Sequence, residues 1–178
     1  MKREIDIQEA ISIIDNSLNK QGRVIQRNRV LKVAILGHPY VIYDEYISLN
    51  ILKKLRKWGI EFVVAENLPS RLKRDFCLQV NLPQEMYWTA GEELMGAAMF
   101  YSLEEDIDGI IYISAFGCGL DSIIEELISL EIISRCNKPY MWLLLDEHTS
   151  EVSFLTRLSA FFDTIKLKNG GRFLEEYK

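Results

Sequence analysis

Short apolar runs alternate with helical patterns along most of this 178-residue chain, and this alternation constrains the fold more than any other feature. The apolar runs predict buried strands near residues 32–37, 61–65, 108–114 and 140–146. The segments between and after them predict helices over residues 47–58, 91–101, 121–134 and 152–166. Parallel strands joined through helices form right-handed crossovers. The sequence therefore predicts an α/β fold: one Rossmann-like, doubly wound, mainly parallel sheet of about four strands, flanked by helices.

The predicted sheet lies within residues 31–167, and shorter segments flank it on both sides. Residues 1–30 are expected to form an N-terminal amphipathic helix, over about 6–19, and a connector, because apolar side chains recur there at helical spacing. Residues 168–178 are expected to be a polar tail. Residues 66–86 contain Pro69 and Pro83 and are expected to be irregular.

Charge and hydropathy exclude several classes of protein. Lysine and arginine number 21 against 26 aspartates and glutamates, and a net charge of −5 argues against nucleic acid as a partner. The apolar runs are far shorter than the roughly 20 residues that span a bilayer, so no membrane association is expected. The acidic N-terminal segment is unlike a signal peptide, and we expect a cytoplasmic protein. Three cysteines cannot form a disulfide framework; in a reducing cytosol they would be packing residues, metal ligands or nucleophiles.

Both histidines and one cysteine fall in loops that follow predicted strands. His38 follows the first strand, Cys118 the third and His148 the fourth. Parallel strands present their carboxyl ends at one edge of the sheet, which is where ligands bind in open α/β folds. These three side chains are therefore expected on one ligand-binding face.

Cys118 has the strongest local signal of the three. Gly117 and Gly119 free its backbone for a tight turn and let another group approach closely. Ser122 and Glu125 have the spacing of a capping box, which places a helix start just after the cysteine. A helix N-terminus favours the thiolate, the form that binds metal or attacks an electrophile. The alternative is a small buried side chain in a strand-to-helix turn.

The two histidine loops also allow more than one interpretation. Glu147 and His148 could orient a catalytic imidazole, bind a metal, or hold their loop through hydrogen bonds. His38 could face a substrate or bond to the backbone. Cys77 lies in the segment without a clear pattern, so its direction is open, whereas Cys136 is expected at the opposite end of the sheet.

Several motifs occur together and in a fixed order. They are Gly37-His38-Pro39-Tyr40, Tyr87-Trp88-Thr89, Phe116-Gly117-Cys118-Gly119, Asp146-Glu147-His148-Thr149 and Thr156-Arg157-Leu158. Together they resemble the activase-related domain of the 2-hydroxyglutaryl-CoA dehydratase and CoA-enzyme activase system. The resemblance extends from about residue 31 to about residue 165, with the N-terminal helix outside it.

The resemblance implies a cofactor and a partner. Proteins of that superfamily hold an iron–sulfur cluster through cysteines of different Rossmann-like subdomains and transfer low-potential electrons to acyl-CoA. By this resemblance Cys118 would be a cluster thiolate beside Gly117, Gly119 and Ser122. His148, Glu147 and His38 would face the cluster or a substrate. Because such clusters commonly take four thiolates, a second copy of the chain, a cysteine-bearing partner subunit, ligands other than cysteine, or Cys77 would have to complete the site.

Three functions follow as hypotheses. The first is a single-domain relative of the dehydratase–activase system that binds a cluster shared with another chain or acts as its accessory. The second is a non-catalytic binding or assembly module that keeps the scaffold without a cluster. The third is a zinc or thiol enzyme that uses Cys118, His38, His148 and an acid, because such ligands suit zinc with an open position for water.

Overall fold

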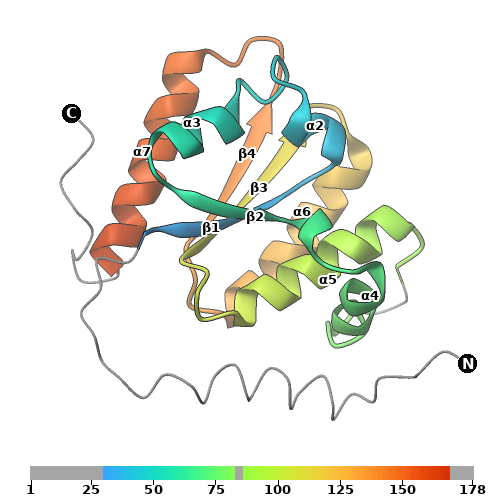
Figure 1. Cartoon of the computed structure of the whole chain (residues 1–178). Helices are drawn as coiled ribbons and strands as arrows, with labels where there is room; N and C mark the ends of the chain where they lie inside the picture. The colour runs from blue at the N-terminus through green and yellow to red at the C-terminus, as the bar shows by residue number, and fades with distance from the viewer. Residues whose placement is uncertain (1–29, 83–85, 169–178) are drawn as a thin grey trace, which may run out of the picture.

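Four short strands pair in parallel to form a single sheet at the centre of the molecule (Figure 1). In the computed structural model, which describes residues 30–82 and 86–168, the strands are β1 (Lys32–Leu36), β2 (Glu61–Val64), β3 (Gly109–Ala115) and β4 (Tyr140–Leu145). Their order across the sheet is β2-β1-β3-β4, and every neighbouring pair is parallel. The predicted α/β fold with a doubly wound parallel sheet is confirmed.

One face of the sheet is covered by α3 (Ile51–Lys57) and α7 (Glu151–Lys168) (Figure 1). Alternate residues of each strand point to this face. Val33 and Ile35 of β1 join Leu55 of α3 and Phe154 of α7 in one hydrophobic cluster. Burial of apolar surface in this cluster holds both helices against the sheet.

The other face is covered by α4 (Ser70–Cys77), α5 (Thr89–Leu103) and α6 (Gly119–Glu131). Ala34 of β1 and Tyr112 of β3 point to this face and pack with Met95 of α5 and Ile124 of α6. Helices on both faces leave β3 buried from Gly109–Ser114, which explains its continuous apolar sequence.

The segment expected to be irregular contains helix in the structure. A 3₁₀ turn at Ala65–Asn67 is followed by α4, which packs against α5. At Gly96 of α5 a Cβ atom would lie 1.7 Å from the carbonyl oxygen of Lys73, so the two helices approach closely because this residue has no side chain. The prolines at 69 and 83 suggested a loop, but Pro69 stands at the N-cap position of α4 and does not interrupt the helix.

The helix expected from residue 47 begins later, at Ile51. Leu49 and Asn50 have φ angles of 49° and 57°, a left-handed conformation that a continuous α-helix cannot contain. Asp44 ends the short helix α2 (Pro39–Tyr43), and its Oδ1 accepts hydrogen bonds from the backbone N–H groups of the second and third residues after it. The aspartate therefore stabilises this turn.

The helix expected over residues 6–19 and the tail expected after residue 168 lie outside the described residues. A 3₁₀ turn at Ile133–Arg135 leads from α6 toward β4. Within residues 30–82 and 86–168, no helix is both long enough and apolar enough to cross a membrane.

Candidate metal centre

The candidate site lies where the direction of chain progression across the sheet reverses. From β1 the chain passes to β2 on one side, then crosses back to β3 on the other side. Ligands of open α/β sheets bind at such a switch point, outside the carboxyl ends of the two central strands. The loops after β1 and β3, at residues 37–38 and 116–118, both lie at this end of the sheet.

Gly37 brings the first of these loops over the neighbouring strand. Its φ is +145°, and a Cβ at this position would lie 2.2 Å from the carbonyl oxygen of Ile113 in β3. Only glycine allows so close an approach between two backbones. The next residue, His38, is therefore placed directly beside the end of β3.

His38 is held at the start of α2. Its carbonyl oxygen accepts hydrogen bonds from the N–H groups of Val41 and Ile42, two buried residues that anchor the helix in the core. The imidazole is 16% exposed, and its Nε2 lies 3.3 Å from Oδ1 of Asp121. The imidazole therefore contacts a side chain of α6, the helix that follows β3, whereas the sequence had suggested contact with a substrate or with the backbone.

Cys118 occupies the N-cap position of α6, so the helix does start just after the cysteine. Its side chain makes no capping hydrogen bond and is partly exposed. Ser122 is not the N-cap that the sequence suggested, because it lies inside the first turn and its hydroxyl donates to the carbonyl oxygen of Cys118 at 3.2 Å. Gly117 has a φ of +81°, the left-handed conformation that was expected for the tight turn before the cysteine.

Asp121 also belongs to this group, although it was not among the site residues predicted from the sequence. It follows Cys118 by three residues at the start of α6, a spacing that puts both side chains on one side of the first turn. Its side chain is 1% exposed, and its Oδ1 accepts a hydrogen bond of 2.9 Å from the hydroxyl of Tyr112. Burial and the neighbouring carboxylate raise the pKa of Tyr112, so the phenol stays a donor. The signal that could have found Asp121 is this spacing at a helix start.

The second carboxylate oxygen of Asp121 is buried and has no hydrogen-bond partner among the described residues. A buried polar oxygen without a partner costs about 1–3 kcal/mol, because it has lost its hydrogen bonds to water. Native proteins tolerate such an atom at sites where a cation or another ligand binds. This oxygen is the clearest indication that the group of His38, Cys118 and Asp121 binds a ligand.

His38, Cys118 and Asp121 together offer one imidazole nitrogen, one sulfur and one carboxylate oxygen, all within 4.8 Å of one another. These are the donor types that bind Zn²⁺ in proteins, at about 2.0–2.3 Å from the metal. Three donors so close together could converge on one ion after small side-chain rotations. The donor set therefore fits a single transition-metal ion.

Glu147 and His148 are not brought into this group. Their side chains are 79% and 86% exposed, and His148 Nε2 lies 3.7 Å from Glu147 Oε1. The loop is held by Asp146, whose Oδ1 accepts from the Thr149 hydroxyl at 2.7 Å and from the His148 N–H at 3.0 Å. These hydrogen bonds lower the pKa of Asp146, and the bond from the Thr149 hydroxyl has the largest effect.

The other two cysteines also lie outside the group. Cys77 ends α4 and is buried in the cluster under α5, where burial and then Glu92 raise its pKa to about 11. Cys136 follows the 3₁₀ turn that precedes β4, at the amino end of that strand. Neither is among the described residues that offer a donor to the His38, Cys118 and Asp121 group.

Comparison with known proteins gives one family match. Residues 6–68 match the model of the CoA enzyme activase uncharacterised domain. The match begins within the N-terminal segment, outside the part of the chain where the resemblance was predicted, and it includes His38 but ends before Cys118 and Asp121. No curated protein and no solved structure matches the chain. The N-terminal part of the chain, through β1 and β2, is thus similar to an activase-related domain, which is the predicted resemblance. Of the five motifs that suggested it, Gly37-His38-Pro39-Tyr40 lies within the match.

Proposed function

We propose that this activase-related α/β domain binds one metal ion at the switch point of its sheet, through His38, Cys118 and Asp121. The observation that carries the proposal is the convergence of three different donor side chains around a buried carboxylate oxygen without a partner. The contact between His38 and Asp121 satisfies only Oδ1.

Electrostatics supports a cation at this position. Asp121 is buried, and a thiolate at Cys118 would add a second negative charge within 4.8 Å. A thiolate and a carboxylate at this separation would repel each other unless a cation lay between them. A divalent ion would neutralise both charges and satisfy the free oxygen, so the cost of burying Asp121 would be offset by binding.

The donor set also indicates the class of metal. One sulfur, one nitrogen and one oxygen suit Zn²⁺ or a similar borderline ion better than the hard ions Mg²⁺ and Ca²⁺, which prefer oxygen ligands. Three protein ligands with one open position are typical of catalytic rather than structural zinc sites. When bound, such an ion supplies Lewis acidity to a ligand in the open position. Partial exposure of Cys118 leaves one side of the group accessible.

Elemental analysis of anaerobically purified protein tests the proposal. We expect about one zinc-class ion per chain in the wild type and in Cys136→Ser, and no retained metal in Cys118→Ser. Cys136 is a matched control because it is also partly exposed but lies at the other end of the sheet. A wild type that stays metal-free after incubation with zinc, or a Cys118→Ser variant that retains a full equivalent, contradicts it.

A second candidate function is an iron–sulfur cluster shared with another chain, for low-potential electron transfer. The similarity of residues 6–68 to a CoA enzyme activase domain and the partial exposure of Cys118 favour it. The group contains one cysteine, so a second copy of the chain or a cysteine-bearing partner subunit would supply the other cluster ligands. The same analysis distinguishes the two candidates, because a cluster would yield iron and acid-labile sulfide in equal amounts. If every preparation is colourless and free of metal, both candidates are contradicted. The remaining hypothesis is then the non-catalytic binding or assembly module.

A further inference from the structure

The phenol of Tyr112 reaches the candidate metal centre from the core of the domain. Tyr112 lies in β3 and is fully buried in the cluster between the sheet and the helices α5 and α6. The hydroxyl of a buried tyrosine needs a hydrogen-bond partner, and an ionised carboxylate can only accept. This hydroxyl donates to Oδ1 of Asp121 at 2.9 Å. A central strand of the core therefore holds one oxygen of a candidate metal ligand.

The two oxygens of Asp121 have different surroundings. Oδ1 accepts the hydrogen bond from Tyr112 and lies 3.3 Å from Nε2 of His38. Oδ2 is buried and has no hydrogen-bond partner within residues 30–82 and 86–168. Because a carboxylate is planar, a fixed Oδ1 leaves Oδ2 little freedom to move. A lone pair that accepts a hydrogen bond is also less available to a metal, so Oδ2 is the better donor of the two.

We propose that Tyr112 is a positioning residue of the metal centre: it occupies Oδ1, so that Asp121 binds the ion through Oδ2 alone. The inference rests on the proposed metal site. Carboxylates bind metals through one oxygen or through two. Binding through one oxygen, together with His38 and Cys118, gives three protein donors and leaves the fourth position of a tetrahedral ion open. Outer contacts of this kind orient metal ligands, and their loss commonly weakens metal binding by about 10- to 100-fold.

A second tyrosine–carboxylate pair on α6 provides a matched control. The hydroxyl of Tyr140 in β4 donates to Oε1 of Glu125 at 3.0 Å. Glu125 follows Asp121 by four residues, one turn further along α6, and both carboxylates are buried. Glu125 is not among the described residues that offer a donor to the candidate metal centre. The two pairs therefore share their kind of hydrogen bond and their helix, but only one of them contains a candidate ligand.

The experiment is a Co²⁺ titration of the full chain under anaerobic conditions, for the wild type, Tyr112→Phe and Tyr140→Phe. Co²⁺ accepts the ligand sets of zinc, and its visible bands are stronger in four-coordinate than in five-coordinate sites. Loss of either hydroxyl should lower the urea midpoint of the metal-free protein, because a buried carboxylate loses a hydrogen bond. Only Tyr112→Phe should bind Co²⁺ about tenfold more weakly. Only in this variant should the bound ion absorb visible light less strongly, because Oδ1 becomes free to bind as well.

Infrared spectroscopy of the wild type gives a second measurement, which does not depend on the folding of a tyrosine variant. The measured quantity is the difference spectrum between Zn²⁺-loaded and metal-free protein, and Asp121→Asn identifies the bands of this carboxylate. Coordination through one oxygen separates the two C–O stretching bands of a carboxylate more widely than in the free ion, whereas coordination through two oxygens brings them closer together. We expect the wider separation, and a narrower one overturns the proposal.

Each failure has a separate meaning. A wild type that shows no visible Co²⁺ bands overturns the proposed metal site itself. A wild type that binds Co²⁺, with Tyr112→Phe equal to it in affinity and absorption, overturns the role of Tyr112 alone. Equal weakening of Co²⁺ binding in Tyr112→Phe and Tyr140→Phe would also overturn that role, because a shared loss of stability would then explain both.

Discussion

At the scale of single residues, Asp121 is the least expected side chain of the site. Its carboxylate is enclosed by the core, Tyr112 and His38 both contact Oδ1, and the other oxygen has no partner among the described residues. A folded domain gains nothing in stability from such an oxygen. The arrangement is reasonable if binding of a cation compensates for it, in the way that functional sites often sacrifice stability.

Asp121→Asn should therefore separate stability from binding. The amide has nearly the same shape and can still accept from Tyr112, but it carries no charge. Without metal, we expect the variant to unfold at the same or a higher urea concentration than the wild type. With Zn²⁺ at about 100 times the dissociation constant, the wild type should gain about 2.7 kcal/mol in unfolding free energy, and the variant should gain far less.

Two controls belong to that measurement. Chelator-treated samples provide the metal-free state, and the Asp163→Asn variant tests whether a loss of charge elsewhere has the same effect. Asp163 is exposed on α7, so its substitution makes the same change in charge away from the site. Its stabilisation by Zn²⁺ should equal that of the wild type. An Asp121→Asn protein that gains as much as the wild type from Zn²⁺ would remove Asp121 from the ligand set.

Residue chemistry explains which site residues the sequence could predict. His38 and Cys118 were predictable because each directly follows a buried strand, and parallel strands share one carboxyl edge. The same rule also pointed to His148, but β4 lies at the edge of the sheet, away from the switch point, and the side chain is 86% exposed. Asp121 was not singled out because an acid in the first turn of a helix is usual there for electrostatic reasons alone.

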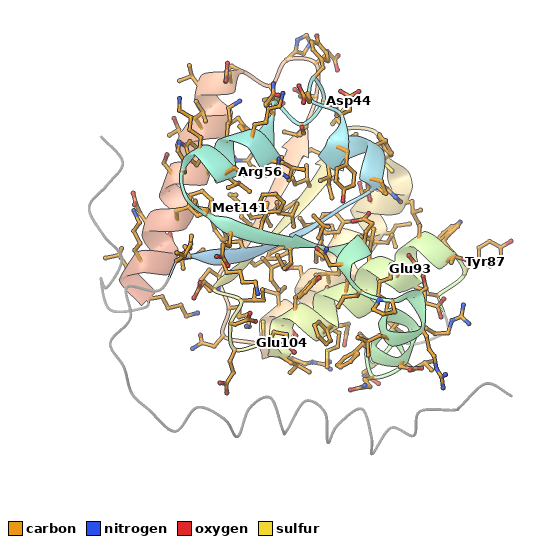
Figure 2. The ribbon with its side chains drawn as sticks, viewed as in Figure 1. Asp44, Arg56, Tyr87, Glu93, Glu104 and Met141 are labelled. Carbon is orange, nitrogen blue, oxygen red and sulfur yellow. The ribbon has the colours of Figure 1, made fainter. Side chains whose placement is uncertain are left out.

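At the scale of elements, the contact between α4 and α5 shows what a sequence pattern can hide. Lys73 of α4 is buried, with its side chain 6% exposed, and its Nζ lies 2.6 Å from Oε2 of Glu93 in α5. In Figure 2, Glu93 lies on α5 where this helix passes close to α4. A buried lysine breaks the apolar periodicity that identifies a helix face. The prolines at 69 and 83 led to the prediction of an irregular segment here, and this lysine left no continuous apolar pattern to argue for a helix, whereas the strands and the long helices were recognised.

The ion pair should make this helix contact sensitive to acid. Hydrogen bonds from Lys73 and Ser70 lower the pKa of Glu93, so its contribution is complete above the ordinary glutamate value of about 4.3 and is lost as the pH falls further. At pH 7, Glu93→Gln should lower the unfolding free energy by about 2 kcal/mol, because Lys73 loses its counter-charge. The difference from the wild type should disappear in acid, when Glu93 itself is protonated.

Urea unfolding at a series of pH values checks this, with Glu131→Gln as the control. Glu131 pairs with Arg135 on the exposed surface of α6 and the turn after it, and such surface pairs contribute at most about 0.5 kcal/mol. A Glu93→Gln effect as small as that of the control, or one that persists unchanged below pH 3, would contradict a stabilising pair between α4 and α5.

At the scale of the whole molecule, the order β2-β1-β3-β4 decides where chemistry can occur. The progression of strands across the sheet changes direction between β1 and β3, and Gly37 and the start of α6 place their neighbouring side chains at this switch point. The alternation of strands and helices predicted the sheet, but not the order of its strands. Without that order, the loops with His38, Cys118 and His148 were equally good candidates for the site. The strand order places the first two beside each other, at the ends of β1 and β3.

The two histidines of the chain provide the most direct test of the central claim. Zn²⁺ affinity should be measured by competition with a chromophoric chelator for the wild type, His38→Ala and His148→Ala. The account predicts at least a 100-fold loss for His38→Ala and no change for His148→Ala, because only His38 lies within 4.8 Å of Cys118 and Asp121. Equal affinities for all three proteins, or a loss confined to His148→Ala, would contradict it.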